Sequence, residues 1–252
     1  MAPHRYLVLF AVAVFVFSVT AGLWLAATVL PIAAQGAATP AAESPLAECE
    51  GPVPDAEIVA VPNQESSVVT ATGALFGRGP TGVIFSNESG NDPCIWLEFA
   101  TSLPSEDFTV MIFSYSGWTP ASDTVGAVAV MRERGVQSVL LIGSSAGANA
   151  SLIAGMTVTP PVDGIAAISF GVTPEIEAGA AQLTMPVLLV TSTDDPLTSG
   201  NESEEQLFLL LPSERQVLIL PGQGHGTILL EGDDGGNVRG VLRAFLDGHA
   251  AT

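Results

Sequence analysis

The sequence of 252 residues contains no lysine and only seven basic residues, all of them arginine, against 26 acidic residues. The formal net charge is −19 at pH 7. Phosphate backbones and anionic lipid surfaces repel a protein of this charge, so the composition argues against nucleic-acid binding. We interpret the acidity as a feature that favours solubility.

Charge is also missing near the N-terminus, where an uncharged, largely apolar stretch runs from Tyr6 to about Ile32. His4 and Arg5 precede this stretch and small residues follow it, an order typical of a secretory signal peptide. An apolar segment of more than ~20 residues is also long enough to span a bilayer, so an uncleaved anchor is the alternative. We therefore interpret residues 1–36 as a signal peptide or N-terminal membrane anchor. We expect an exported protein, extracellular or in the cell envelope, with membrane attachment only through residues 6–32.

Cysteine is nearly absent, since Cys49 and Cys94 are the only two in the chain. A metal site built on cysteine needs further Cys or His ligands at close spacing, and the sequence offers none. In an exported protein such a pair more often forms a disulfide, and two unrelated thiols are the alternative. Residues 37–56, rich in Ala, Pro and Glu, are predicted to be a flexible linker, and residues 57–252 the folded domain. The expected disulfide pins this linker to the domain.

From Ser66 onward, short apolar runs alternate with segments of helical character, which favours a mostly parallel sheet covered by helices on both faces. The later runs are rich in Val, Ile and Leu without polar alternation, as in strands buried on both faces. The predicted strands are Ser67–Thr72, Gly73–Phe76, Gly82–Ser86, Thr109–Ser114, Ser138–Gly143, Gly164–Phe170, Pro186–Ser192 and Gln216–Leu220.

The predicted helices lie between these runs. They are Pro93–Leu103, Thr124–Arg134, Ala148–Met156, Glu202–Leu211 and Val238–Leu246. The sequence thus predicts an α/β fold, a three-layer α/β/α sandwich around a mostly parallel sheet of about eight strands. Only 15 residues separate Phe170 from Pro186, too few for a large cap domain.

The most informative motif is Gly143-Ser144-Ser145-Ala146-Gly147, which follows an apolar run directly and leads into a helix of small residues. A Gly-x-Ser-x-Gly turn between a strand and a helix holds its serine hydroxyl in an exposed position, as a nucleophile requires. Taken alone, the motif is weak evidence, because such a string more often marks only a tight strand-to-helix turn.

Two further polar residue types follow later strands. Asp194 and Asp195 come directly after the run that ends near Ser192, and His225 lies in a glycine-rich loop after the last run. Ligands of such sheets bind beyond the carboxyl ends of the strands, where all of these residues are expected. A serine needs a base to become nucleophilic, histidine titrates in the useful range, and a carboxylate orients the imidazole.

These motifs identify a resemblance to the α/β-hydrolase fold family that covers Ser67 to Phe245. The chain is similar to compact, lidless bacterial esterases and dienelactone-hydrolase-like proteins. The resemblance implies Ser145 as nucleophile, His225 as base and Asp195 as acid, with Asp194 as the alternative acid. No cofactor or metal is implied.

The oxyanion hole implied by the resemblance uses two backbone N–H groups. One is that of Ala146, and the second comes from the loop after the Gly82–Ser86 run, where Ser89 is the first choice and Glu88 the next. Relatives carry His followed by Gly or Gln in this loop, whereas this chain has Asn87 and Glu88, which leaves the competence of the hole open.

Several aromatic residues could contribute to substrate binding. Trp118, Trp96 and Phe85 either form an apolar wall for an acyl or aromatic group or pack in the core.

We predict an exported serine hydrolase that cleaves a small-molecule carboxylic ester, thioester or lactone through an acyl-enzyme on Ser145. One alternative is a catalytically silent hydrolase-like domain that binds a partner at the cell surface. Another is a haloperoxidase-like or transferase enzyme on the same scaffold.

Overall fold

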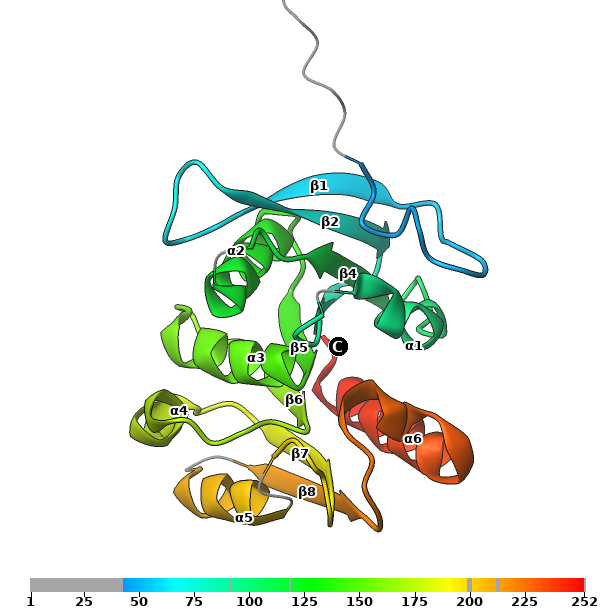
Figure 1. Cartoon of the computed structure of the whole chain (residues 1–252). Helices are drawn as coiled ribbons and strands as arrows, with labels where there is room; N and C mark the ends of the chain where they lie inside the picture. The colour runs from blue at the N-terminus through cyan, green and yellow to red at the C-terminus, as the bar shows by residue number, and fades with distance from the viewer. Residues whose placement is uncertain (1–42, 91, 118, 199–200, 212–213, 252) are drawn as a thin grey trace, which may run out of the picture. The chain divides into compact units, whose positions relative to one another are not determined.

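The computed structural model of the chain describes residues 43–90, 92–117, 119–198, 201–211 and 214–251. Their strands form one eight-stranded sheet in the order β1-β2-β4-β3-β5-β6-β7-β8 (Figure 1). The pairs β1–β2 and β2–β4 are antiparallel and the other neighbouring pairs are parallel. The strands are β1 (Glu57–Pro62), β2 (Thr70–Gly77), β3 (Thr81–Ser86), β4 (Phe108–Ser114), β5 (Ser138–Ser144), β6 (Gly164–Ile168), β7 (Val187–Ser192) and β8 (Arg215–Leu220). The predicted mostly parallel sheet is confirmed.

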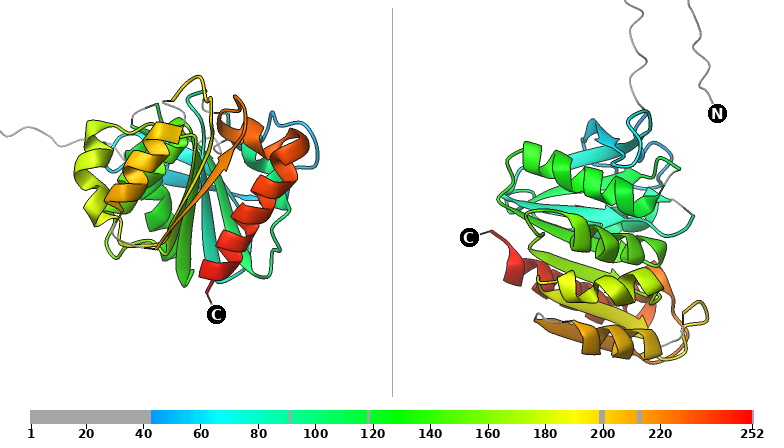
Figure 2. Two further views of the ribbon diagram at one scale, coloured as in Figure 1. Left: turned by 90° about the horizontal axis from the view of Figure 1, so that it is seen from below. Right: turned by 90° about the vertical axis from the view of Figure 1, so that its left-hand side faces the viewer.

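Helices cover both faces of this sheet, as the left-hand view of Figure 2 shows. One face carries α2 (Pro120–Glu133), α3 (Ala146–Thr157), α4 (Pro174–Gly179) and α5 (Asn201–Leu210), and the other carries α1 (Leu97–Thr101) and α6 (Gly232–His249). Short 3-10 turns are η1 (Pro93–Trp96), η2 (Ala180–Gln182) and η3 (Gly226–Leu230). The three-layer sandwich expected from the sequence is therefore present.

Alternating side chains of the central strands fill two separate cores. Leu141 of β5 packs in the core beneath α2 and α3, whereas its neighbour Leu140 packs in the core beneath α6. Successive side chains of a strand point to opposite faces, so a strand covered on both sides must be apolar at every position. This requirement explains the unbroken apolar runs of β3, β5 and β7, whose residues are all buried.

Two details of the sheet differ from the sequence prediction. Thr70–Thr72 of the first predicted strand and all of the second, Gly73–Phe76, belong to one strand, β2, whereas Ser67–Val69 precede it. The edge strand β1 lies in a segment for which we predicted none. In β1, buried Val59 and Val61 alternate with exposed Ala60 and Pro62, so this edge strand is only partly covered.

The segment between β6 and β7 contains only α4 and η2. It therefore holds no cap domain, as predicted, although we did not predict α4 itself. Among the described residues, no helix is long and apolar enough to cross a membrane. The predicted signal peptide or anchor, residues 1–36, lies outside the described residues.

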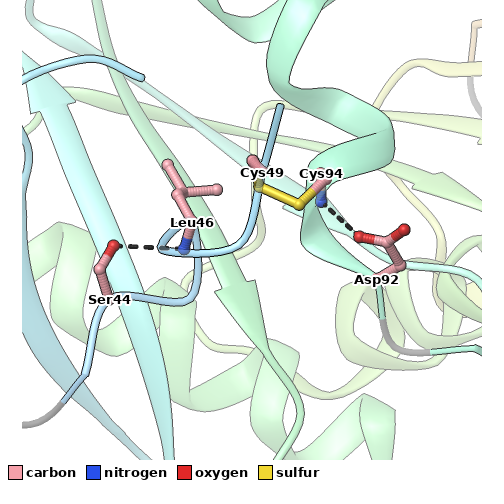
Figure 3. Close-up of a disulfide and its surroundings, with 5 residues drawn as sticks. All are labelled: Ser44, Leu46, Cys49, Asp92 and Cys94. Carbon is pink, nitrogen blue, oxygen red and sulfur yellow. Dashed lines mark hydrogen bonds between the residues drawn. A yellow bond between two sulfur atoms is a disulfide. The ribbon is translucent and has the colours of Figure 1, made fainter. Parts of the chain in front are cut away.

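A disulfide joins Cys49 to Cys94, as the sequence predicted (Figure 3). Part of the segment interpreted as a linker packs on the domain: Leu46 is completely buried in the core beneath α6. Cys94 lies in η1, where the Asp92 side chain accepts a hydrogen bond from its N–H at 2.8 Å. The disulfide therefore holds residues 44–49 against the segment that follows β3.

Removing this disulfide is expected to destabilise the domain. The bond closes a loop with a sequence separation of 45 residues. A cross-link over a loop of this size restricts the unfolded chain, so the C49A/C94A variant should lose about 2–4 kcal/mol of unfolding free energy in urea denaturation. Reductant should lower the stability of the wild type by a similar amount and leave the variant unchanged. Equal stability of the two proteins without reductant would contradict this role.

Candidate active site

Three side chains that follow different strands meet at the carboxyl edge of the sheet. Ser145 follows β5 directly, Asp195 lies three residues after β7, and His225 lies five residues after β8. The parallel strands β5, β6, β7 and β8 end at the same edge, so loops that are distant in sequence converge there.

Ser145 occupies a strained turn between β5 and α3. Its φ of 54° and ψ of −118° lie outside the usual regions for a residue with a side chain, at a cost of about 1–3 kcal/mol. Flanking glycines make this turn possible: a Cβ on Gly143 would lie 2.1 Å from the Gly147 carbonyl oxygen, and one on Gly147 would lie 2.2 Å from the Ser86 carbonyl oxygen. The Ser145 N–H donates to the Ile168 carbonyl at 2.8 Å, which ties the turn to β6.

The three side chains form a continuous hydrogen-bonded chain. His225 Nε2 lies 2.9 Å from Ser145 Oγ, and His225 Nδ1 lies 2.8 Å from each Asp195 carboxylate oxygen. Asp195 is 4% exposed and also accepts the Leu197 N–H at 2.9 Å. A carboxylate can only accept, so this contact favours the tautomer with the proton on Nδ1, in which Nε2 accepts from the serine hydroxyl.

The structure distinguishes between the two adjacent aspartates. Asp194 is exposed, and its carboxylate lies 3.1 Å from the Thr193 hydroxyl, which donates to it. Its backbone N–H donates to the Gly222 carbonyl at 2.9 Å. Asp195, not Asp194, is therefore the aspartate in contact with His225.

Side chains from neighbouring strand ends hold the loop that carries His225. The Ser192 hydroxyl donates to the Gly224 carbonyl at 2.5 Å, and the Gly226 N–H donates to Ser169 Oγ at 2.9 Å. The Thr227 N–H donates to Glu88 Oε1 at 2.7 Å. Because each contact joins residues at least 32 positions apart, no local sequence pattern identified these partners.

The loop after β3 lies directly against the start of α3. A Cβ on Gly147 would approach the carbonyl oxygens of both Ser86 and Asn87 within 2.5 Å. The buried Asn87 side chain donates to the Phe113 carbonyl at 2.5 Å, and the Tyr115 hydroxyl donates to the Asn87 carbonyl at 2.8 Å. Burial raises the pKa of Tyr115, so this hydroxyl stays protonated near neutral pH. The loop is thus fixed beside the turn that carries Ser145.

The two residues predicted from the sequence as oxyanion donors belong to the two segments that meet here, the loop after β3 and the start of α3. Ala146 is the first residue of α3, and Ser89 is exposed in the turn after Asn87 and Glu88. Glu88 is engaged by the Ser144 hydroxyl and by Thr227.

The aromatic residues considered as a substrate wall divide into two groups. Phe85 and Trp96 are completely buried, with ring centroids 5.1 Å apart, and Trp96 Nε1 donates to the Ser86 carbonyl at 3.2 Å. They belong to the core, so the substrate-wall alternative does not hold for these two residues. Trp118 lies outside the described residues.

A groove of about 350 Å³ begins beside the turn that carries Ser145 and runs along α3. Ala146, Asn149, Ala150 and Ile153 recur at helical spacing and form one of its walls. The remaining lining residues are Glu65, Thr119, Pro120, Ala121 and Glu175. The helix wall of the groove is thus apolar except for Asn149, and two exposed carboxylates are among the other lining residues.

Metal-ligating side chains do not cluster in the part of the chain that the structure describes. Across those residues, no group of three or more His, Cys, Asp or Glu side chains is arranged to hold a metal ion.

Comparisons with known proteins identify similarity at the level of structure. No protein-family model matches the sequence, and no curated protein is significantly similar to it. A dienelactone hydrolase from Anabaena variabilis is similar to this chain with a TM-score of 0.66 and 18% identity, over 79% of this chain and 99% of that one.

Two other solved structures with hydrolase names are similar to this chain over most of its length. An esterase from Pyrococcus furiosus has a TM-score of 0.62 and 13% identity, over 78% of this chain and 92% of its own. A proline iminopeptidase from Mycobacterium smegmatis has a TM-score of 0.60 and 11% identity, over 77% of this chain and 98% of its own. With the eight-stranded sheet, the strained serine turn and the Ser145–His225–Asp195 contacts, these similarities show that the protein has the α/β-hydrolase fold.

Proposed function

We propose that this protein is a serine hydrolase that cleaves small-molecule carboxylic esters through an acyl-enzyme on Ser145. The observation that carries the proposal is the hydrogen-bonded chain from Ser145 Oγ through His225 to Asp195. This arrangement of nucleophile, base and orienting carboxylate is the one that acyl-transfer enzymes use on several unrelated folds.

Acylation begins when Ser145 Oγ attacks the ester carbonyl carbon and His225 Nε2 takes the hydroxyl proton. Asp195 keeps the proton on Nδ1 and stabilises the imidazolium that forms. When the tetrahedral intermediate collapses, the bond to the alcohol oxygen breaks and Nε2 returns its proton to that oxygen. Water then attacks the acyl-enzyme with His225 as base, which releases the carboxylic acid and restores the Ser145 hydroxyl.

The tetrahedral oxyanion needs donors whose positions are set before the reaction. In the proposed mechanism these are the backbone N–H groups of Ala146 and Ser89. The contact of Gly147 with the carbonyls of Ser86 and Asn87 supports this assignment, because it brings the two segments together. No cofactor or metal takes part in this mechanism.

The groove along α3 is the proposed binding region for part of the substrate, since Ala146 belongs both to its lining and to the proposed oxyanion hole. Structural neighbours of this chain include a dienelactone hydrolase and an esterase, so ester and lactone substrates are the first choices. Glu65 and Glu175 line the groove, and the whole chain carries a net charge of −19. The substrates proposed are therefore uncharged, because carboxylates repel an anionic acyl group.

Charge selectivity should be visible in kinetics. The kcat/KM for p-nitrophenyl butyrate is expected to exceed that for mono-p-nitrophenyl succinate by about threefold to tenfold, and added salt should shrink the difference. An E65Q/E175Q variant should reduce this preference without changing kcat/KM for the butyrate ester. If the wild type and the variant prefer the butyrate ester over the succinate ester to the same extent, the groove is not the binding region for the acyl group.

Export is part of the proposal. The Cys49–Cys94 disulfide supports an oxidising compartment, in agreement with the interpretation of residues 1–36 as a signal peptide or anchor.

The test of the proposed function is labelling with a fluorophosphonate probe, followed by mass spectrometry of the labelled peptide. A serine activated by His225 should be labelled at position 145, and labelling should fall strongly in the His225→Ala variant. A folded protein that stays unlabelled and hydrolyses no ester would favour a catalytically silent binding domain. The acidic residue Glu88 beside the proposed oxyanion hole is the feature that motivates this alternative.

A further inference from the structure

The carboxylate of Glu88 joins three segments of the proposed active site: the loop after β3, the end of β5 and the start of η3. It comes from the loop after β3, and its Oε1 accepts a hydrogen bond from Ser144 Oγ at 2.7 Å. The same oxygen accepts the Thr227 N–H at 2.7 Å and the Thr227 hydroxyl at 3.0 Å. Ser144 directly precedes the nucleophile, and Thr227 lies two residues after His225.

From these contacts we infer that Glu88 is a positioning residue that fixes the His225 loop relative to the nucleophile turn. The inference rests on the proposed function, since it gives Glu88 a role in the same site. Glu88 itself is not assigned a contact with substrate or with Ser145. It acts through Thr227 on one side and through Ser144 on the other.

Three donors on one oxygen explain why an acidic residue stands at this position. An ionised carboxylate is a purely accepting group, and hydrogen bonds to it are roughly twice as strong as those between neutral groups. Neutral glutamine offers a weaker acceptor oxygen and adds two N–H donors. The chemistry of the donor set therefore matches glutamate better than its isosteric amide.

The backbone at Gly226 is shaped around this carboxylate. Gly226 has a φ of +65°, and a Cβ placed on it would lie 2.1 Å from Glu88 Oε1 and 2.9 Å from Ser144 Oγ. The carboxylate thus occupies the space that a side chain on the residue after His225 would need. Close packing and hydrogen bonding together leave Gly226 and Thr227 little freedom to shift.

The position of this loop matters because proton transfer depends on short distances. His225 Nε2 is 2.9 Å from Ser145 Oγ, within the range for direct transfer. A displacement of a catalytic group by about 1 Å can cost on the order of 10²-fold in rate. Ser192 and Ser169 restrain residues 224 and 226, and Glu88 adds the restraint at Thr227 that also reaches the nucleophile turn.

The kinetic test compares three variants with the wild type on p-nitrophenyl butyrate. Glu88→Ala should lower kcat by about 10²-fold with KM changed less than about threefold, because the reacting groups are displaced while the substrate groove remains. Glu88→Gln keeps an acceptor oxygen and should recover activity to within about tenfold of the wild type. Thr227→Val removes only the hydroxyl contact and should lower kcat by about threefold to tenfold.

The matched control is Glu98→Gln. Glu98 is an exposed glutamate on α1 that pairs with Arg239, and its replacement should leave kcat and KM unchanged. Wild-type kcat in both Glu88→Ala and Thr227→Val would overturn the positioning role. If Glu88→Ala does not fold, Glu88→Gln and Thr227→Val carry the comparison.

A second measurement does not depend on activity. Amide hydrogen exchange of Thr227, followed by NMR, should be at least about tenfold faster in Glu88→Ala than in the wild type, since the N–H loses its acceptor. Unchanged exchange in a folded Glu88→Ala protein would overturn the inference. A wild type that neither labels nor hydrolyses esters would overturn the proposed function instead, and the exchange experiment would still decide the role of Glu88.

Discussion

Replacing Ser145 with alanine is expected to lower kcat/KM for an activated ester by at least about 10³-fold, because the proposed mechanism forms the acyl-enzyme on the Ser145 hydroxyl. The variant should also lose labelling by a fluorophosphonate probe. Substitution removes one oxygen atom and keeps the turn between β5 and α3, so the melting temperature should change little. Steady-state kinetics on p-nitrophenyl butyrate and mass spectrometry of the labelled peptide provide the measurements.

A control for this experiment is Ser102→Ala. Ser102 is exposed at the end of α1, where its hydroxyl donates to the Phe99 carbonyl at 2.6 Å. This variant should hydrolyse the ester at the wild-type rate and label fully. A Ser145→Ala protein that retains wild-type turnover would disprove the serine mechanism.

The second large effect is expected for Asp195→Asn, which should lower kcat by about 10³- to 10⁴-fold. The asparagine amide can donate to His225 Nδ1, and this favours the tautomer with the proton on Nε2. In that tautomer Nε2 no longer accepts the proton of Ser145. KM should change little, since Asp195 is buried behind the histidine and 4% exposed. The measurement is kcat and KM with an activated ester.

Asp194→Asn is the matched control, because it makes the same chemical change one residue away. Asp194 is exposed and its carboxylate contacts the Thr193 hydroxyl, so kcat should stay within about twofold of the wild-type value. Comparable losses in both variants would contradict the assignment of Asp195 as the orienting carboxylate.

Much of the fold could be predicted from local sequence patterns. The central strands β3, β5 and β7 are buried on both faces and therefore appear as continuous apolar runs. The edge strand β1 was missed because its apolar run, Ile58–Val61, is only four residues long and borders the Pro-rich segment interpreted as a linker. Helix α4 was missed because its six residues make less than two turns, too few to show a helical period in the sequence.

The candidate site, like the fold, was predicted in part from the sequence and in part only from the structure. Three features of the site could be recognised in the sequence because each follows an apolar run: the Gly-x-Ser-x-Gly turn, the aspartate pair and the glycine-rich His225 loop. Their positions just after predicted parallel strands indicated that they would meet at one edge of the sheet. The choice between Asp194 and Asp195 depends on which carboxylate points inward, and only the packed structure provides this answer.

By itself, the sequence determined the fold class, the serine turn and the types of residue that follow three strands, because each depends on neighbours a few positions away. Only the tertiary structure decided how the parts of the site are held together. Glu88 and Thr227 are 139 residues apart in the sequence. Their hydrogen bond forms because the loops that follow β3 and β8 lie at the same edge of the sheet. Such contacts leave no periodic signal in the chain, since one polar residue in each of several loops suffices to make them.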